Sequence, residues 1–198
     1  MRKRGNICIA LGGIILTIAL LLALWNQYED YKAKLSSENT MAQIMENINS
    51  SALQGVNNSE IPDPYDPEMT EKEIDGIKYV GYISIPKINR ELPIISEWSY
   101  PNLKISPCRF SGSSKTDNLI IAGHNYRSHF GLLGKLKAGD EVILTDMDGA
   151  RTVYQVVALD VLNPDALEDL MSEEYALTLF TCTYDTENRI TVRCDKKQ

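Results

Sequence analysis

The distribution of apolar residues divides the chain into three parts with different textures. Residues 7–25 are apolar on every side, and the stretch Ile7–Leu24 contains no charged residue. Residues 26–75 are polar and acidic and are rich in Asn, Ser and Glu. Residues 76–198 contain short runs of Val, Ile, Tyr and Thr separated by turn residues. The pattern predicts a hydrophobic segment, a polar connection and one folded domain.

The hydrophobic segment has the length of a membrane-spanning helix. As a helix, Ile7–Leu24 measures about 27 Å, close to the roughly 30 Å of a bilayer core. The sequence MRKR precedes it, and Trp25 and Tyr28 follow where an interfacial aromatic belt lies. A cleaved signal peptide is the alternative, but the run exceeds the roughly 7–15 residues of a signal core, and no clear A-x-A site follows.

The basic residues before the segment also predict its orientation. The positive-inside rule places residues 1–6 in the cytoplasm and residues 26–198 outside. We therefore expect a single-pass type II protein of the plasma membrane, with its folded domain on the extracellular face.

The polar connection, residues 26–75, begins with enough helix formers over 29–48 to extend a stalk helix. Helix breakers then follow at Gly55, Pro62, Pro64 and Pro67. We expect this stalk to be a spacer that holds the folded domain away from the membrane.

Short strands separated by turns fill the third part. The runs are YVGYISI, ELPII, NLIIA, EVILT, TVYQVVAL, ALTLF and RITVRC. Helical patterns are brief, near residues 129–136 and 165–173. So many short strands in about 120 residues predict a mainly β domain over residues 76–198, closed into a barrel of about eight strands with short helices.

The net charge and the cysteine content limit the partners and metal sites that can be expected. The formal charge of −7 and the pI near 4.9 argue against a nucleic-acid partner. No C-x-x-C or His/Cys ligand pair is present, so no metal site is predicted. Cys8 lies in the apolar segment, which leaves three exported cysteines. A Cys108–Cys194 disulfide with a free Cys182 is one possibility, and three free thiols are the other.

Three residues at predicted strand ends could form a thiol active site. Cys182 ends the run ALTLFTC, His124 follows the run NLIIA, and Arg189 begins the next strand. A cysteine nucleophile needs a thiolate and a proton carrier, which histidine can supply. Cleavage of an amide also needs a donor for the developing oxyanion, and arginine is one.

Less specific interpretations of the same residues stay open on sequence alone. Cys182 could be a small core residue, and His124 could cap a turn. His129, in NYRSHFG, is interpreted as a loop or helix-cap residue. Spacing along the chain does not show whether Cys182 and His124 meet.

Several motifs in their order resemble a known enzyme family. TLFTC resembles the TLxTC signature of the sortases, the membrane-anchored cysteine transpeptidases of Gram-positive bacterial surfaces. YVGYISIPKINRELPI resembles the first barrel strands of that family, LIIAGHN the strand before its histidine, and LKAGDEVIL a following strand. The resemblance covers residues 79–195 and implies a sortase-type β-barrel.

The resemblance also implies roles for individual residues. Cys182 matches the nucleophile and His124 the residue that transfers protons. Arg189, in NRITVRC, occupies the position of the family's arginine, and Arg193 is the alternative on the same strand face. Thr181 matches a position that contacts substrate or assists the oxyanion.

The implied reaction is a two-step acyl transfer without metal or cofactor. Cys182 attacks the Thr–Gly carbonyl of an LPxTG-like sorting signal on a surface protein, and a second amine then resolves the thioester. That amine belongs to a peptidoglycan precursor or, in the alternative, to a pilin lysine. A thiol hydrolase and a non-catalytic membrane-anchored binding module are rival functions, although intact Cys, His and Arg argue against the latter.

The subclass depends on weaker features. Asp63-Pro64-Tyr65 resembles the lid motif of pilin-polymerising relatives, but residues 62–67 are equally typical of a Pro-rich linker. The sequence ends at Gln198 without a second apolar segment, which favours protein anchoring. Tyr184 stands where some relatives have proline after TCT, and this leaves the subclass open.

Overall fold

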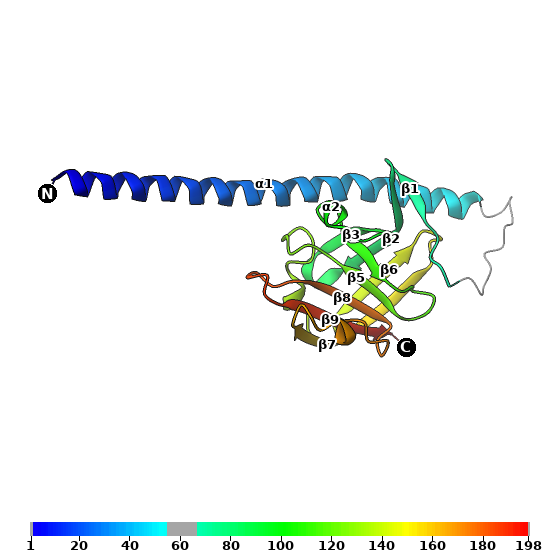
Figure 1. Ribbon diagram of the computed structural model, residues 1–198. Helices are drawn as coiled ribbons and strands as arrows, with labels where there is room; N and C mark the ends of the chain where they lie inside the picture. Colours follow the sequence, from blue (N-terminus) through cyan, green and yellow to red (C-terminus); the bar gives the residue numbers. More distant parts are fainter. Residues whose placement is uncertain (1, 55–66, 198) are drawn as a thin grey trace.

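The computed structural model describes residues 2–54 and 67–197 and combines one long helix with a β-barrel (Figure 1). The helices are α1 (Arg2–Gln54), α2 (Tyr100–Leu103) and α3 (Leu167–Leu170), with 3-10 turns η1 (Pro86–Ile88) and η2 (Leu133–Lys135). The strands are β1 (Lys72–Ile74), β2 (Ile77–Ile85), β3 (Arg90–Ile95), β4 (Cys108–Ser111), β5 (Leu119–Ala122), β6 (Glu141–Asp146), β7 (Arg151–Leu162), β8 (Leu177–Cys182) and β9 (Arg189–Lys196).

Eight strands close into a mixed barrel, which confirms the predicted fold class. The strand order is β1-β2-β3-β4-β5-β8-β9-β7-β6, and pairing of β2 with β6 closes the sheet. β3–β4 and β5–β8 are parallel pairs, and the other pairs are antiparallel. β1 lies outside the closed ring as a hairpin partner of β2, and its short run KEI carried no strand signal.

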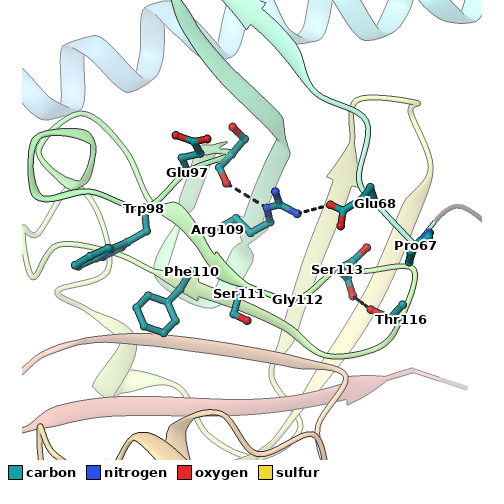
Figure 2. A pocket seen from close by; sticks show the side chains of 11 residues that line it. Pro67, Glu68, Glu97, Trp98, Arg109, Phe110, Ser111, Gly112, Ser113 and Thr116 are labelled. Carbon is teal, nitrogen blue, oxygen red and sulfur yellow. Dashed lines mark hydrogen bonds and ion pairs between the residues drawn. The ribbon is translucent and has the colours of Figure 1, made fainter.

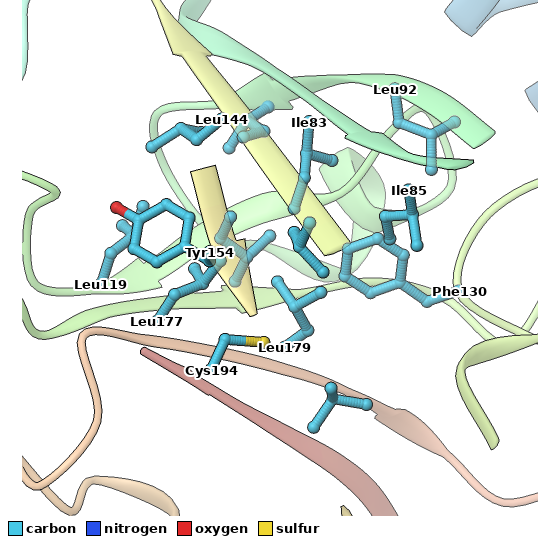
Figure 3. Close-up of a cluster of buried hydrophobic side chains, with 14 of the residues drawn as sticks. Ile83, Ile85, Leu92, Leu119, Phe130, Leu144, Tyr154, Leu177, Leu179 and Cys194 are labelled. Carbon is cyan, nitrogen blue, oxygen red and sulfur yellow. The ribbon is translucent and has the colours of Figure 1, made fainter. Parts of the chain in front are cut away.

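The barrel interior is filled by inward-facing side chains from nearly every strand (Figure 3). Those labelled in the figure are Ile83, Ile85, Leu92, Leu119, Phe130, Leu144, Tyr154, Leu177, Leu179 and Cys194. β8 is buried from Leu177 to Thr181, and only its last residue, Cys182, is partly exposed. Truncation of a core residue such as Leu179 to alanine costs about 2–5 kcal/mol in comparable cores. The strand that carries Cys182 is therefore a rigid support.

The N-terminal part of α1 extends beyond the barrel (Figure 1). Its most hydrophobic 18-residue window has a mean hydropathy of 2.2 and is 0% buried. Large apolar side chains such as Leu16, Leu22 and Trp25 are exposed there. By length and composition this part could cross a membrane.

The C-terminal part of α1 packs on the barrel, which the sequence did not predict. The residues buried by this contact are Ala33, Ser37, Thr40, Met41 and Ile44. They recur at intervals of three, four and one and form a single helix face. Small and polar residues make up much of that face, so its apolar character is weak until the barrel is present. The part of the predicted stalk from Asp30 to Ile44 thus packs on the barrel. The possible lid motif Asp63-Pro64-Tyr65 lies outside the described residues.

Candidate active site

Cys182 and Arg189 lie directly opposite each other at one end of the barrel. Cys182 is the last residue of β8, Arg189 is the first of β9, and the antiparallel register pairs the two. The connection between them is closed by hydrogen bonds from the backbone N–H of Thr183 to the carbonyl of Asn188 (2.9 Å) and from the N–H of Asn188 to the hydroxyl of Thr183 (3.1 Å). The six residues between the two strands therefore form a hairpin that joins β8 to β9.

His124 reaches the same end of the barrel from β5. β5 and β8 are parallel, with Ala122 opposite Phe180, and the N–H of Gly123 donates to the carbonyl of Phe180 (3.0 Å). Extending this register by two residues beyond the end of β5, through Gly123 and Thr181, would bring His124 opposite Cys182. A side chain at Gly123 would not fit, because its Cβ would lie 2.4 Å from Cδ2 of Phe130.

The His124 ring is half-buried and stacked on an aromatic neighbour. Its centroid lies 3.8 Å from that of Tyr126, with 17° between the planes. Burial lowers the pKa of His124 below its usual value, and the hydrogen bond with Asn125 opposes this effect. Nδ1 is buried and has no hydrogen-bond partner among the described residues. A neutral imidazole with an uncommitted nitrogen is suited to accept a proton.

An apolar cavity of about 140 Å³ opens beside Cys182 and Arg189. Thr181 and Gly123 also line it, whereas His124 does not. The hydroxyl of Thr181 is buried and unpartnered in the described structure. The remaining wall is mainly hydrophobic and aromatic, from Trp98, Tyr100, Leu103, Phe110, Ala122, Leu162, Leu167, Leu170 and Phe180. The cavity can therefore receive an apolar side chain of a substrate whose reacting carbonyl lies at the cysteine.

Arg193, the alternative arginine, is committed to structural contacts. Its side chain is 3% exposed, and Nη1 donates to the carbonyl of Leu170 (3.2 Å) and the hydroxyl of Thr178 (3.1 Å). Nη2 donates to the carbonyl of Asp169, and Nε lies 3.5 Å from a carboxylate oxygen of Asp160. Arg193 thus fixes α3 against β8 and β9 and has few donors left for a substrate.

The other two cysteines of the barrel are buried free thiols. Cys108 and Cys194 belong to different core clusters, on β4 and β9, and no disulfide joins them. Burial raises the pKa of each thiol to about 12. Within residues 67–197, Cys182 is the only cysteine that is not fully buried. It is therefore the thiol best placed to react. No group of three or more potential metal ligands occurs among the residues that the structure describes.

A second cavity, of about 540 Å³, adjoins the first (Figure 2). Trp98 and Phe110 line both cavities. Their rings pack edge to face with centroids 5.7 Å apart, and Phe110 packs in the same way on Phe180 at 5.3 Å. Figure 2 shows Arg109 on the far side, where it donates to the carbonyl of Ser96 (3.1 Å) and lies 3.3 Å from Glu68. Phe180 belongs to the TLFTC motif, but Trp98 and Phe110 belong to no motif, and nothing in the sequence marked them as neighbours of the site.

Comparison with known proteins identifies the family. A model of the sortase domain matches residues 83–197, which include His124, Cys182 and Arg189. The chain belongs to the sortase family. This is a transpeptidase family, and the eight-stranded barrel described above is its fold.

Several named sortases are similar to this one. Sortase A of Bacillus anthracis is 28% identical over 170 residues, which cover 81% of this chain and 80% of that protein. Sortase C1 from Streptococcus agalactiae is 29% identical with a TM-score of 0.57, covering 85% of this chain and 96% of that chain. Clostridium perfringens sortase C, in a structure with the C-terminal cell wall sorting motif, is 26% identical with a TM-score of 0.54, covering 81% of this chain and 90% of that chain.

Proposed function

We propose that this sortase is a cysteine transpeptidase that cleaves an LPxTG-like C-terminal sorting signal and transfers the protein to an amine. The observation that carries the proposal is the pairing of Cys182 with Arg189 at the mouth of an apolar cavity. His124 follows the neighbouring parallel strand and supplies the proton carrier. The structure of a C. perfringens relative with its cell wall sorting motif supports a sorting signal as the substrate class.

The first half-reaction forms a thioester. His124 first takes the proton of the Cys182 thiol. The resulting thiolate attacks the Thr–Gly carbonyl carbon, and the C=O electron pair moves onto oxygen. The guanidinium of Arg189 donates to this oxyanion, a role in which one donor contributes about 10²–10³ in kcat. When the C–N bond breaks, the leaving amine takes a proton from His124. The glycine-side fragment departs, and the acyl group stays on sulfur.

The second half-reaction restores the enzyme. An amine attacks the thioester carbon and gives a proton to His124, and collapse of the oxyanion breaks the C–S bond. A new amide is formed and the Cys182 thiolate is regenerated. The thioester conserves the energy of the cleaved bond, so this cycle draws on side chains of the chain alone. Thr181, with its buried hydroxyl lining the cavity, is proposed to contact the peptide beside the scissile bond.

The amine acceptor is proposed to belong to a peptidoglycan precursor. A pilin lysine is the second candidate, because structural relatives are sortase C enzymes and one is described in relation to pilin substrate specificity. We also propose that the exposed apolar part of α1 anchors the chain in the plasma membrane in a type II orientation. The barrel would then meet membrane-linked substrates on the extracellular face.

The test is incubation of the full-length protein in detergent with LPxTG-like and NPxTN-like peptides, each with a peptidoglycan stem peptide or a lysine-containing pilin peptide. Mass spectrometry of the products identifies both the cleaved bond and the acceptor. We expect cleavage after threonine and amide formation with one of the acceptors. If every mixture gave only the hydrolysed product, with a free carboxylate on the threonine, a thiol hydrolase would be favoured instead. Cys182→Ala serves as the inactive control.

A further inference from the structure

The residues after β5 form a compact loop that carries His124 at its start; we call residues 123–131 the histidine loop. The carbonyl of His124 accepts the N–H of Phe130 (3.1 Å). The carbonyl of Tyr126 accepts the N–H groups of His129 (3.0 Å) and Gly131 (2.9 Å). These bonds fold the loop back on itself, so its parts move together.

Within the histidine loop, ring contacts connect His124 to a buried partner. His124 stacks on Tyr126, and Tyr126 contacts the ring of His129 with centroids 5.6 Å apart. His129 is completely buried, and its Nε2 lies 3.5 Å from the hydroxyl of Ser37 on α1. The expectation of a simple loop or cap residue at His129 therefore missed its burial against α1. The position of the His124 ring therefore depends on the contacts that hold Tyr126 and His129 in place.

Helix α1 supplies that hold from a distant part of the sequence. The carboxylate of Asp30 accepts hydrogen bonds from the N–H (2.9 Å) and the hydroxyl of Ser128. The hydroxyl of Ser128 also lies 3.2 Å from the carbonyl of Asp30. Hydrogen bonds to a carboxylate are the stronger class, and Ser128 is almost fully buried, so its donors have little alternative in water.

The same helix is fixed to the barrel at a second place. Ile44 is buried in a core cluster with Tyr79, Ile95 and Cys108. Between Asp30 and Ile44, one face of α1 lies on the barrel (Figure 1). The helix can therefore resist movement of the histidine loop relative to the strands that carry Cys182.

We propose that α1 is a positioning element of the acyl-transfer site, in which Asp30 holds the histidine loop so that His124 stays beside Cys182. Asp30 touches no reacting atom and acts only through Ser128. The inference rests on the proposed function for the reaction that His124 serves. It predicts that loss of the Asp30 contact lowers the rate of chemistry more than substrate binding.

Loss of the Asp30 contact should also change the pKa of His124. Because burial is the main cause of its lowered pKa, release of the loop hydrates the ring and moves the pKa up toward about 6.5. Other titratable or charged groups also lie near this ring or the neighbouring loop rings: Glu29 and Asp30 on α1, Arg90 on β3, Lys104, Tyr126 and His129, with Cys182 and Arg189 at the adjoining strand ends. None of these groups is changed by Asp30→Asn except Asp30 itself.

The experiment compares three variants of the full-length protein in detergent. Asp30→Ala removes the acceptor, Asp30→Asn keeps an acceptor oxygen for Ser128, and Gln43→Ala is the matched control. Gln43 also joins α1 to the barrel by a side-chain hydrogen bond, to Asp75 (3.2 Å), in the part of α1 beyond Ser37. We expect Asp30→Ala to lose about tenfold in kcat with little change in KM, and the other two to stay within about threefold of wild type.

Histidine NMR titration provides the second readout and does not require activity. We expect the pKa of His124 to rise in Asp30→Ala and to stay at its wild-type value in Asp30→Asn and Gln43→Ala. Equal kcat and equal His124 pKa in Asp30→Ala and Gln43→Ala would overturn the proposal. So would a loss of kcat in Asp30→Ala with an unchanged His124 pKa, since that describes general destabilisation. Absence of acyl transfer in the wild type would instead refute the proposed function, while the titration would still test the contact.

Discussion

The two arginines of β9 test the proposed site directly. Their side chains are chemically identical, but they lie at different distances along the strand from Cys182. Arg189 is opposite Cys182 in the register. Arg193 is four residues further along, roughly 13 Å at the rise of a strand. A guanidinium reaches about 6–7 Å from its Cα, so Arg189 can meet an oxyanion at Cys182 and Arg193 cannot without leaving its buried partners.

The experiment replaces each arginine by lysine in separate variants. Arg189→Lys replaces a planar fork of donors by a single ammonium, and we expect kcat to fall by about 10²–10³ with nearly unchanged stability. Arg193→Lys leaves the carbonyls of Asp169 and Leu170 without their donor. We expect a loss of about 2–3 kcal/mol in the free energy of unfolding, but a kcat within about threefold of wild type for the folded protein.

The assay combines peptide-cleavage kinetics with urea unfolding of the same preparations. Since α3 lines the cavity and is held by Arg193, a higher KM in Arg193→Lys is consistent with the account. The opposite order of kcat, with Arg193→Lys the more damaged of two folded variants, would refute the assignment of Arg189.

Three further predictions concern ionisation and thiol exposure. In an NMR titration His124 should have a pKa below 6.5, because burial disfavours its charged form, and a value at or above 6.5 would contradict the described burial. Burial lowers the pKa of His129 to about 4. The unfolded state then binds the additional proton between about pH 6.5 and 4, so the free energy of unfolding should fall by about 3 kcal/mol as pH decreases through this window. In His129→Gln this slope should disappear from the urea-unfolding series, and its persistence would assign the slope to other groups. Alkylation of the native, unreduced barrel should modify Cys182 alone, whereas Cys108 and Cys194 should react only after unfolding without reductant; failure to label them then would indicate a disulfide.

The sequence was sufficient where local patterns determine the structure. Runs of β-branched and aromatic residues marked most barrel strands, and the six residues between Cys182 and Arg189 implied a hairpin that brings the two together. These features depend on neighbours in sequence.

Contacts between distant segments could not be predicted in this way. Asp30 and Ser128 are 98 residues apart in the sequence. The face of α1 that packs on the barrel is partly polar, so the sequence did not indicate this contact. The burial of His129 and the carbonyl ligands of Arg193 on α3 depend on the same kind of long-range packing. The aromatic wall that joins the two cavities is assembled from Trp98, Phe110 and Phe180 only when the strands have paired.

The proposed transpeptidation requires Cys182 to carry the acyl group between the two half-reactions. The direct measurement is peptide-mapping mass spectrometry of the full-length protein quenched in acid shortly after mixing with an LPxTG-like peptide and no added amine. We expect a thioester of the peptide's threonine-side fragment on the tryptic peptide that contains Cys182, and we expect it to disappear when an amine is added before the quench. Product release with no acyl group on Cys182 at any time, or an acyl group on another residue, would contradict it.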